Sequence, residues 1–343
     1  MDFIDLRSDT VTRPTAEMLA AMAAAEVGDD VFGEDPTVKK LEETAARILG
    51  KQAGLLVTSG TMGNLVSVLT HTQKGDEVLL ESESHINYYE VGGISALAGA
   101  MPRPVQGQKG KITAQGLAEA LRPENIHFPT PALLCLENTH NRGGGTVSTP
   151  SEMQEVIAPA RQHGLKVHLD GARIFNAALA AGVKVSELAV GCDSVMFCLS
   201  KGLGAPVGSL VTGSGEFIAS ARKWRKMVGG GMRQAGVIAA AGLVALETMT
   251  ERLAEDHANA RFLAAGLANI PKLRLDASLV QTNIVVVDLA EDLGGADAFL
   301  TRLKAEGVLA TGFGPHTVRF VTHKDVNRQG IDFALQVITR MVR

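Results

Sequence analysis

The segment LKVHLDGARIFNAALAAG, residues 165–182, contains the pattern on which the fold of this chain depends. Its first six residues are typical of a short buried strand ending at Asp170, and a helix is predicted to follow directly. The next apolar stretch, DSVMFCLS at 193–200, ends one residue before Lys201. Strand, helix and strand in this order predict a βαβ unit, whose parallel strands end at the same edge of a sheet.

The same alternation of short apolar strands and helices extends over most of the chain. Helix signals flank two further segments: Pro36 and Gly50 bound PTVKKLEETAARILG, and Ser151 is the predicted cap of SEMQEVIAPARQHG. Further strands are predicted at DEVLLES (76–82), PALLCLENTH (131–140) and GSLVTG (208–213). We therefore expect an α/β protein with a mostly parallel central sheet and helices on both faces.

The pattern changes towards the C-terminus. Residues 232–268 are almost wholly helical in pattern, and shorter strands and helices follow them. We expect a large α/β domain over residues 1–250, with the N-terminal segment, and a smaller α+β domain over 251–343.

The composition is that of an ordinary globular protein. Of 343 residues, 45% are hydrophobic and 20% charged, and the net charge of −4 argues against nucleic acid or an anionic membrane as partner. The cysteines at 135, 192 and 198 have no paired spacing and read as reduced core residues. An acidic, polar N-terminus and the lack of any apolar run of about 20 residues argue against a signal peptide or membrane span, so we expect a cytoplasmic protein.

Polar residues follow several of the predicted strands. Asp170 and Lys201 stand at two strand ends, His85 follows a third, and His140 follows a fourth within a predicted turn. Ligands of open parallel sheets bind beyond the carboxyl ends of the strands. The sequence therefore predicts a functional site at this edge.

Lys201 is a candidate Schiff-base nucleophile, although a lysine beginning a loop is by itself more often a surface residue. Pyridoxal phosphate (PLP) requires such a lysine, an acid facing its ring nitrogen, and a nest of N–H groups for its phosphate. Asp170 supplies the acid, and VTSGTMGNL at 57–65 supplies a glycine turn before a helix, with Gly60 and Thr61 at its start. The three features together predict PLP.

Several longer motifs extend this reading. They are IDLRSDTVTRPT (4–15), SGTMGN (59–64), ESESHI (81–86), HLDGARI (168–174), CLSKGLGAPVGS (198–209), WRKMVGGGMRQAG (224–236) and VRFVTH (318–323). With these motifs the chain resembles the PLP-dependent, L-specific threonine aldolases, which have the aspartate-aminotransferase-like fold, also called fold type I. The resemblance covers residues 4–323, nearly the whole chain.

The resemblance implies cofactor contacts for eight residues. PLP would form a Schiff base with Lys201, pair its ring nitrogen with Asp170, stack on His85 and bind its phosphate at the helix start. The implied contacts are Lys201, Asp170, His85, Gly60, Thr61, Arg173, Lys226 and Arg233. Lys226 and Arg233 would reach the phosphate of a neighbouring subunit, which implies a homo-oligomer, in this family a tetramer built as a dimer of dimers. Otherwise RKWRK at 222–226 reads as a solvated helix face.

The resemblance also implies substrate contacts. Ser8, Arg173 and Arg319 would bind the substrate carboxylate, a task that suits the planar guanidinium fork. His85 would be the base and His127 would assist it near the hydroxyl group, although His127 is almost as well explained as an ordinary loop histidine. The other histidines have no metal-ligand spacing, so no metal site is expected.

The implied reaction is the reversible cleavage of L-threonine, L-allo-threonine, or both, to glycine and acetaldehyde; no motif distinguishes the two substrates. A β-eliminating lyase or an aminotransferase on the same fold is the alternative. A non-catalytic relative is disfavoured because Lys201 and Asp170 are both present. A nicotinamide dehydrogenase is disfavoured because no G-x-G-x-x-G stands in a first strand-turn-helix unit.

Overall fold

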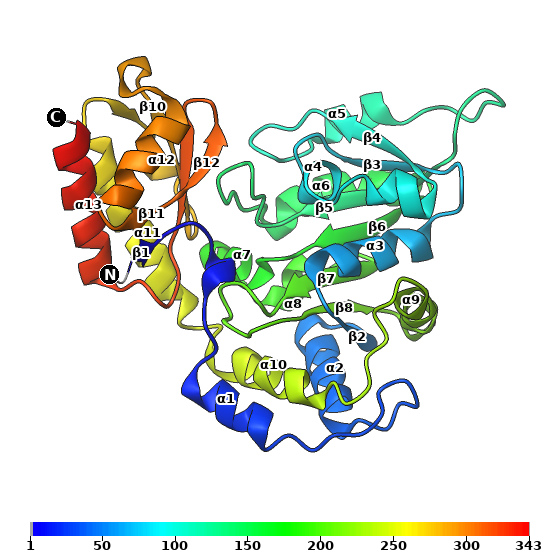
Figure 1. The fold of residues 1–343 in the computed structure, drawn as a ribbon. Coiled ribbons are helices and arrows are strands. Elements are labelled where there is room, and N and C mark those ends of the chain that lie inside the picture. Colours follow the sequence, from blue (N-terminus) through cyan, green and yellow to red (C-terminus); the bar gives the residue numbers. More distant parts are fainter. Residues whose placement is uncertain (1–2, 343) are drawn as a thin grey trace.

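The computed structural model describes residues 3–342 and shows a large unit beside a smaller one (Figure 1). The large unit is built around a seven-stranded sheet with strand order β2-β8-β7-β6-β5-β3-β4, in which β8 alone runs antiparallel to its neighbours. The strands are β2 (Ala53–Val57), β3 (Glu77–Glu81), β4 (Met101–Val105), β5 (Pro131–Glu137), β6 (Lys166–Asp170), β7 (Ser194–Cys198) and β8 (Ser209–Gly213). The mostly parallel sheet expected from the sequence is confirmed.

Helices cover both faces of this sheet because its strands are apolar on both sides. In β7, Met196 packs in the core under α3 and α9, whereas its neighbours Val195 and Phe197 belong to the core of the opposite face. The helices of the large unit are α1 (Ala16–Ala23), α2 (Pro36–Leu49), α3 (Gly60–His71), α4 (His85–Tyr88), α5 (Ala114–Ala120), α6 (Pro150–Gln162), α7 (Ile174–Ala181), α8 (Val185–Leu188), α9 (Gly215–Met227) and α10 (Gly236–Thr248).

Local signals position the helix ends. Helix α2 begins at Pro36 and ends before Gly50, which has a left-handed φ of 66°, as predicted. The prediction that Ser151 caps α6 is wrong. The cap is Thr149, whose hydroxyl accepts from the Glu152 N–H (3.3 Å) while the Glu152 carboxylate accepts from the Thr149 N–H (2.7 Å). This reciprocal box, with a proline as the first helical residue, moves the start of α6 upstream of Ser151.

The smaller unit is an antiparallel sheet of order β12-β13-β10-β9 packed against three helices. Its elements are β9 (Leu273–Arg274), β10 (Ile284–Leu289), β12 (Thr311–Gly314), β13 (Thr317–Val321), α11 (Leu253–Ala268), α12 (Gly295–Ala305) and α13 (Arg328–Val342). The N-terminal strand β1 (Ile4–Asp5) pairs with β11 (Val308–Leu309), and Leu6 is fully buried in the apolar core of this unit. The small unit therefore includes residues 4–6 as well as the C-terminal part of the chain.

Within residues 3–342, the structure has no helix with the length and apolar character needed to cross a membrane.

Candidate active site

A cavity of about 290 Å³ lies between the two units and the N-terminal segment. Five residues expected from the sequence line it together: Ser8, His85, Arg173, Lys201 and Arg319. The small unit closes it with Phe313 on β12 as well as Arg319 on β13. A separate cavity of about 230 Å³ is lined by Glu81 and Glu137 and by none of the expected site residues, so the inter-unit cavity is the candidate site.

Lys201 reaches this cavity from the turn between β7 and β8 and is partly buried. Its carbonyl oxygen accepts from the Thr12 hydroxyl (3.1 Å) and from the Gly204 N–H (2.8 Å), which fixes the backbone of the turn. In the described part of the chain, no acceptor is hydrogen-bonded to or ion-paired with its Nζ. The amine is thus available to a ligand that enters the cavity.

Asp170, the last residue of β6, is a buried carboxylate with 1% of its surface exposed. One oxygen accepts from the Ala172 N–H (3.0 Å) and the other from Asn64 Nδ2 (2.8 Å). Among the residues that the structure describes, no cationic side chain forms an ion pair with it. Since buried charges are normally paired, Asp170 fits a cationic group supplied by a ligand, such as a protonated ring nitrogen.

The start of α3 is a candidate phosphate site. The Ser59 hydroxyl caps the N–H of Met62, whereas the N–H groups of Gly60 and Thr61 donate to no acceptor within residues 3–342. A Cβ on Gly60 would lie 2.9 Å from Cys198 Sγ, so only glycine fits here. Free N–H groups at the positive end of a twelve-residue helix favour an anion.

Arg173 is held by a residue that the sequence reading did not single out. Its Nε and Nη2 donate to the two carboxylate oxygens of Asp9 (2.7 and 2.6 Å), and both side chains are buried. Burial alone would raise the pKa of Asp9, but the Arg173 guanidinium outweighs it and lowers that pKa to about 2. The pair leaves Nη1 of Arg173 available to the cavity.

Arg319 is a partly buried cation without an anionic partner in residues 3–342. Its Nη1 donates to Asn141 Oδ1 (2.7 Å) and its Nη2 to the Arg7 carbonyl (3.2 Å), while its buried Nε has no acceptor in the described structure. Burial, with a further contribution from the nearby charge of Arg173, lowers the pKa of Arg319 to about 10. The negative charge of a carboxylate in the cavity would offset both the burial of the Arg319 cation and its repulsion by Arg173. The geometry therefore favours an anionic substrate group.

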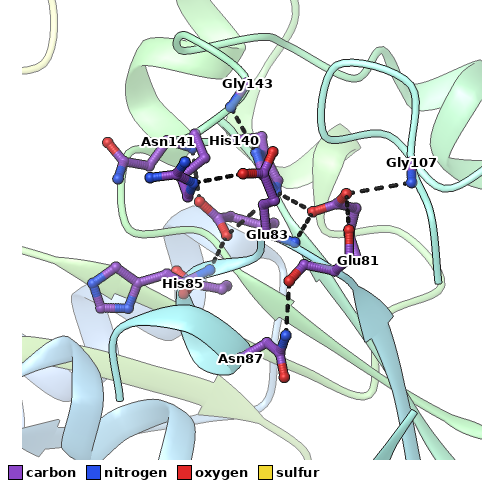
Figure 2. A network of polar contacts seen from close by, with 12 residues as sticks. Glu81, Glu83, His85, Asn87, Gly107, His140, Asn141 and Gly143 are labelled. Atoms are coloured by element: carbon purple, nitrogen blue, oxygen red, sulfur yellow. Dashed lines mark hydrogen bonds and ion pairs between the residues drawn. The ribbon is translucent and has the colours of Figure 1, made fainter. Parts of the chain in front are cut away.

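A polar network behind the cavity positions His85 (Figure 2). Glu137, at the end of β5, accepts from the His85 N–H (2.6 Å) and the Asn141 N–H (2.8 Å). The ring of His85 points away from this network in Figure 2. One carboxylate therefore ties together the strand end, the start of α4 and the loop that carries Asn141.

His140 lies in the predicted turn, and its ring is buried in the same network, with Nε2 3.0 Å from a carboxylate oxygen of Glu81. Burial opposes the charged imidazolium, but Glu137 and Glu81 outweigh it, so the pKa of His140 is raised. The turn was predictable, but the buried ring was not.

Six of the expected residues are not in the lining of this cavity: Gly60, Thr61 and Asp170, described above, and three exposed side chains, His127, Lys226 and Arg233. His127 is exposed in the loop before β5, at the amino edge of the sheet, whereas the cavity lies at the carboxyl edge. Lys226 is exposed at the end of α9, and Arg233 is exposed and paired with Asp29 (3.1 Å). Within one chain, the structure does not bring these three side chains to Lys201.

The basic run 222–226 is not a solvated face throughout. Arg225 is buried; its Nη2 donates to Asp30 (2.6 Å) and its Nη1 to the Leu56 carbonyl (2.7 Å). Lys226, the next residue, points to solvent. The run therefore combines a buried structural ion pair with an exposed cation.

In residues 3–342, one group of side chains has spacing that a metal ion could use: His85, Glu90 and Asp170 offer ligand atoms within 4.8 Å of one another. His85 and Glu90 contact each other directly, and Asn64 links Glu90 to Asp170. Asn64 Nδ2 donates to both carboxylates (2.8 Å each), and Glu90 Oε1 is 2.9 Å from His85 Nδ1. The three side chains are thus linked by hydrogen bonds, and of them His85 lines the cavity.

Comparisons with known proteins show the family and the fold. The beta-eliminating lyase family model matches residues 5–291. A probable low-specificity L-threonine aldolase of Arabidopsis thaliana is 46% identical and aligns over 98% of this chain and 97% of its own length. The low specificity L-threonine aldolase of Escherichia coli K12 is 44% identical over 95% of each chain. The solved Leishmania major threonine aldolase, 19% identical, superposes with a TM-score of 0.84 over 99% of both chains and shares the fold.

Proposed function

Since this chain belongs to the beta-eliminating lyase family, we propose that it is a PLP-dependent, low-specificity L-threonine aldolase, a carbon–carbon lyase. It cleaves L-threonine and L-allo-threonine to glycine and acetaldehyde, and other β-hydroxy-α-amino acids are further substrates. One observation carries the proposal. A single cavity brings an unpaired lysine, a histidine and two guanidinium groups from both units to one place, and one of these guanidiniums has no anionic partner in the described chain.

The residues present fit PLP. Lys201 would hold it as a Schiff base, Asp170 would supply the missing anionic partner of the ring nitrogen, and the ring of His85 would stack on it. The free N–H groups of Gly60 and Thr61 would hold the phosphate. When bound, PLP supplies an electron sink for the electrons of the broken Cα–Cβ bond.

The chain's own residues orient the amino acid. Nη1 of Arg173 and the guanidinium of Arg319 would bind its carboxylate, with Ser8 beside them, and this would fix the orientation of the amino acid in the cavity. His85 takes the proton of the β-hydroxyl group, and the reacting atoms lie in the cavity between the two units. This division of tasks requires the small unit, because Arg319 comes from β13.

Lys226, Arg233 and His127 act, in this proposal, on the cavity of a second copy. All three are exposed and lie away from the cavity of their own chain. A homo-oligomer, a tetramer in this proposal, supplies these cations to a neighbouring phosphate and His127 to a neighbouring substrate. The amino-acid substrate and the cofactor are the small-molecule partners, and the cytoplasm is the proposed compartment.

The test is an absorbance spectrum of the purified protein followed by acetaldehyde assays with L-threonine and L-allo-threonine separately. A visible PLP band and acetaldehyde from either substrate support the proposal, and the ratio of the two rates gives the stereochemical preference. A yellow protein that releases pyruvate or exchanges amino groups, without acetaldehyde, supports a β-eliminating lyase or an aminotransferase. A protein that takes up no added PLP contradicts the cofactor itself.

Arg319→Leu is expected to raise KM for L-threonine and to lower kcat/KM by about 100-fold, because a charge-assisted bidentate contact is lost. It should leave the unfolding temperature unchanged or raised, since the native side chain is a partly buried cation without an anionic partner in the described chain. Steady-state kinetics check the change in KM and kcat/KM, and thermal unfolding checks the unfolding temperature.

Arg7→Leu is the matched control, because that side chain is half exposed and, among the described residues, is paired only with Asp5. It should change neither quantity appreciably. A lower unfolding temperature with unchanged KM in Arg319→Leu would show that Arg319 is structural.

A further inference from the structure

Glu90 lies in the turn after α4 and is buried, with 6% of its surface exposed. Its Oε1 is 2.9 Å from His85 Nδ1 and accepts from Asn64 Nδ2 at 2.8 Å. Asn64 ends the SGTMGN motif, but no role for it or for Glu90 was predicted from the sequence, and the proposed function uses neither to hold PLP or the substrate carboxylate. A buried carboxylate bonded to the proposed base calls for a separate explanation.

The direction of each hydrogen bond around Asn64 can be worked out from its partners. Asn64 Nδ2 has two N–H groups, and the two carboxylates of Glu90 and Asp170 accept one each. Its Oδ1 therefore faces His168 Nε2 (3.0 Å), which must carry a hydrogen. Asn64 thus presents donors, and only donors, to Glu90 and Asp170.

The hydrogen bonds beyond His168 agree with this assignment. With Nε2 protonated, a neutral His168 accepts at Nδ1 from the Ser194 hydroxyl (2.8 Å), whose oxygen accepts in turn from His71 Nε2 (2.8 Å). Burial lowers the pKa of His168 to about 3 and that of His71 to about 4, so both rings are neutral. Each ring then has one donor and one acceptor nitrogen, as this series of hydrogen bonds requires.

Glu90 consequently faces His85 as an acceptor. Burial raises the pKa of Glu90, and the hydrogen bonds from His85 and Asn64 oppose that rise. When Glu90 is ionised, its Oε1 accepts from both Asn64 and His85, so the hydrogen of the neutral His85 ring resides on Nδ1. The lone pair is then on Nε2. The same arrangement of carboxylate and imidazole orients the base in hydrolytic triads.

We propose that Glu90 is the positioning residue of His85: it holds the hydrogen on Nδ1, so that Nε2 takes the proton of the substrate's β-hydroxyl group. The inference rests on the proposed aldolase function and deepens it. The O–H bond of the substrate breaks, a new N–H bond forms at Nε2, and the imidazolium that results is stabilised by Glu90, which does not itself take the proton. Through Asn64 the same amide orients Asp170, so the base and the anion facing the ring nitrogen are fixed by one side chain.

The electrostatics of His85 support this role. The charged groups facing it are Glu90, Asp170 and Lys201, and the Tyr89 ring lies with its centroid 5.4 Å away. Burial disfavours the imidazolium, but Glu90 and Asp170 outweigh burial and Lys201, so the pKa of His85 is raised. Removing the charge of Glu90 should therefore lower it.

The first test uses cofactor-free protein and no substrate. Histidines are modified with diethyl pyrocarbonate, which reacts with neutral imidazole, across a range of pH, and the modification of His85 is followed by peptide mass spectrometry. In Glu90→Gln the pH midpoint of His85 modification should move to lower pH than in the wild type. Glu83→Gln is the matched control, because Glu83 lies two residues from His85 but is exposed and paired with Arg142; its midpoint should not move.

The second test follows kcat/KM for L-threonine against pH. In Glu90→Gln the acid limb should move to lower pH, and the plateau of kcat should fall about tenfold or more, because a weaker base takes the proton. Glu90→Asp keeps the charge and should restore the position of the acid limb. A merely structural role predicts a lower rate or stability with both pH midpoints unchanged, and that result overturns the proposal.

A third measurement needs no variant at Glu90, in case the buried amide prevents folding. In wild-type protein labelled with ¹⁵N-histidine, and with His85 assigned by its loss in His85→Gln, the neutral ring should carry its hydrogen on Nδ1. A ring protonated on Nε2 overturns the proposal. The pH midpoint of His85 modification and the tautomer can behave as stated while the wild type releases no acetaldehyde. In that case the aldolase assignment fails and the positioning role stands.

Discussion

Lys201→Ala is expected to lose the visible absorbance of bound PLP together with acetaldehyde release from L-threonine. The rate should fall by about 10⁴-fold or more, because one substitution removes both the covalent anchor and the nucleophile. The fold should be unaffected. Within residues 3–342, Nζ makes no hydrogen bond or ion pair, and the contacts that fix this turn come from the Lys201 carbonyl, which alanine retains.

Lys324→Ala is the control for a general effect of removing a lysine near this turn. Lys324 packs close to Gly204, three residues after Lys201, and pairs with Asp325 at the surface. It should keep the absorbance and the rate. A Lys201→Ala protein that retains a Schiff-base spectrum, or a substantial fraction of the wild-type rate, would contradict the assignment of Lys201.

The parallel sheet was predictable because its signals are local. Short apolar runs, proline and glycine at helix boundaries, and polar residues directly after strands all lie within a few residues of the feature they predict. Asp170 and Lys201 could be placed at one sheet edge for that reason. The cap of α6 was misplaced by two residues because serine and threonine are equally good caps, and only the reciprocal contact of Thr149 with Glu152 distinguishes them.

The site was less predictable where its contacts join distant segments. Arg173 and Asp9 are 164 residues apart, and Asn64 and Asp170 are 106 apart, so no spacing in the sequence reveals either pair. Glu90 stands in a glycine-rich turn, where an acidic residue is ordinarily solvated. Its role depends on burial, which follows from the packing of α3 and α4 and leaves no signature in the sequence.

Asp9→Asn is expected to lower the free energy of unfolding by about 3 kcal/mol and to raise KM for the amino acid. Arg173 is 7% exposed and Asp9 is fully buried, so the variant leaves a guanidinium without its counter-charge. The carboxylate also fixes the plane of the guanidinium through two contacts, at 2.7 and 2.6 Å, and this sets the direction of the nitrogen that faces the cavity. Denaturant unfolding and steady-state kinetics measure the two effects.

The same ion pair predicts how stability depends on pH. The pKa of Asp9 is lowered to about 2 in the folded protein, from 3.8 in the unfolded chain, so the folded state binds fewer protons in this range. A depressed carboxyl pKa contributes stability that is fully present above the unfolded value and is lost as pH falls through the folded one. For Asp9 this amounts to about 2 kcal/mol, lost between about pH 4 and pH 2.

Asp9→Asn should therefore lose less stability than the wild type over that acidic interval, although it starts from a lower value. Asp5→Asn is the matched control: Asp5 pairs with the half-exposed Arg7, so its removal should cost less than about 1 kcal/mol. If Asp9→Asn matched the wild type in stability and its acid dependence, the buried pair would contribute nothing to the fold. In that case the substrate carboxylate alone would orient Arg173. The KM of Asp9→Asn for the amino acid would then equal that of the wild type.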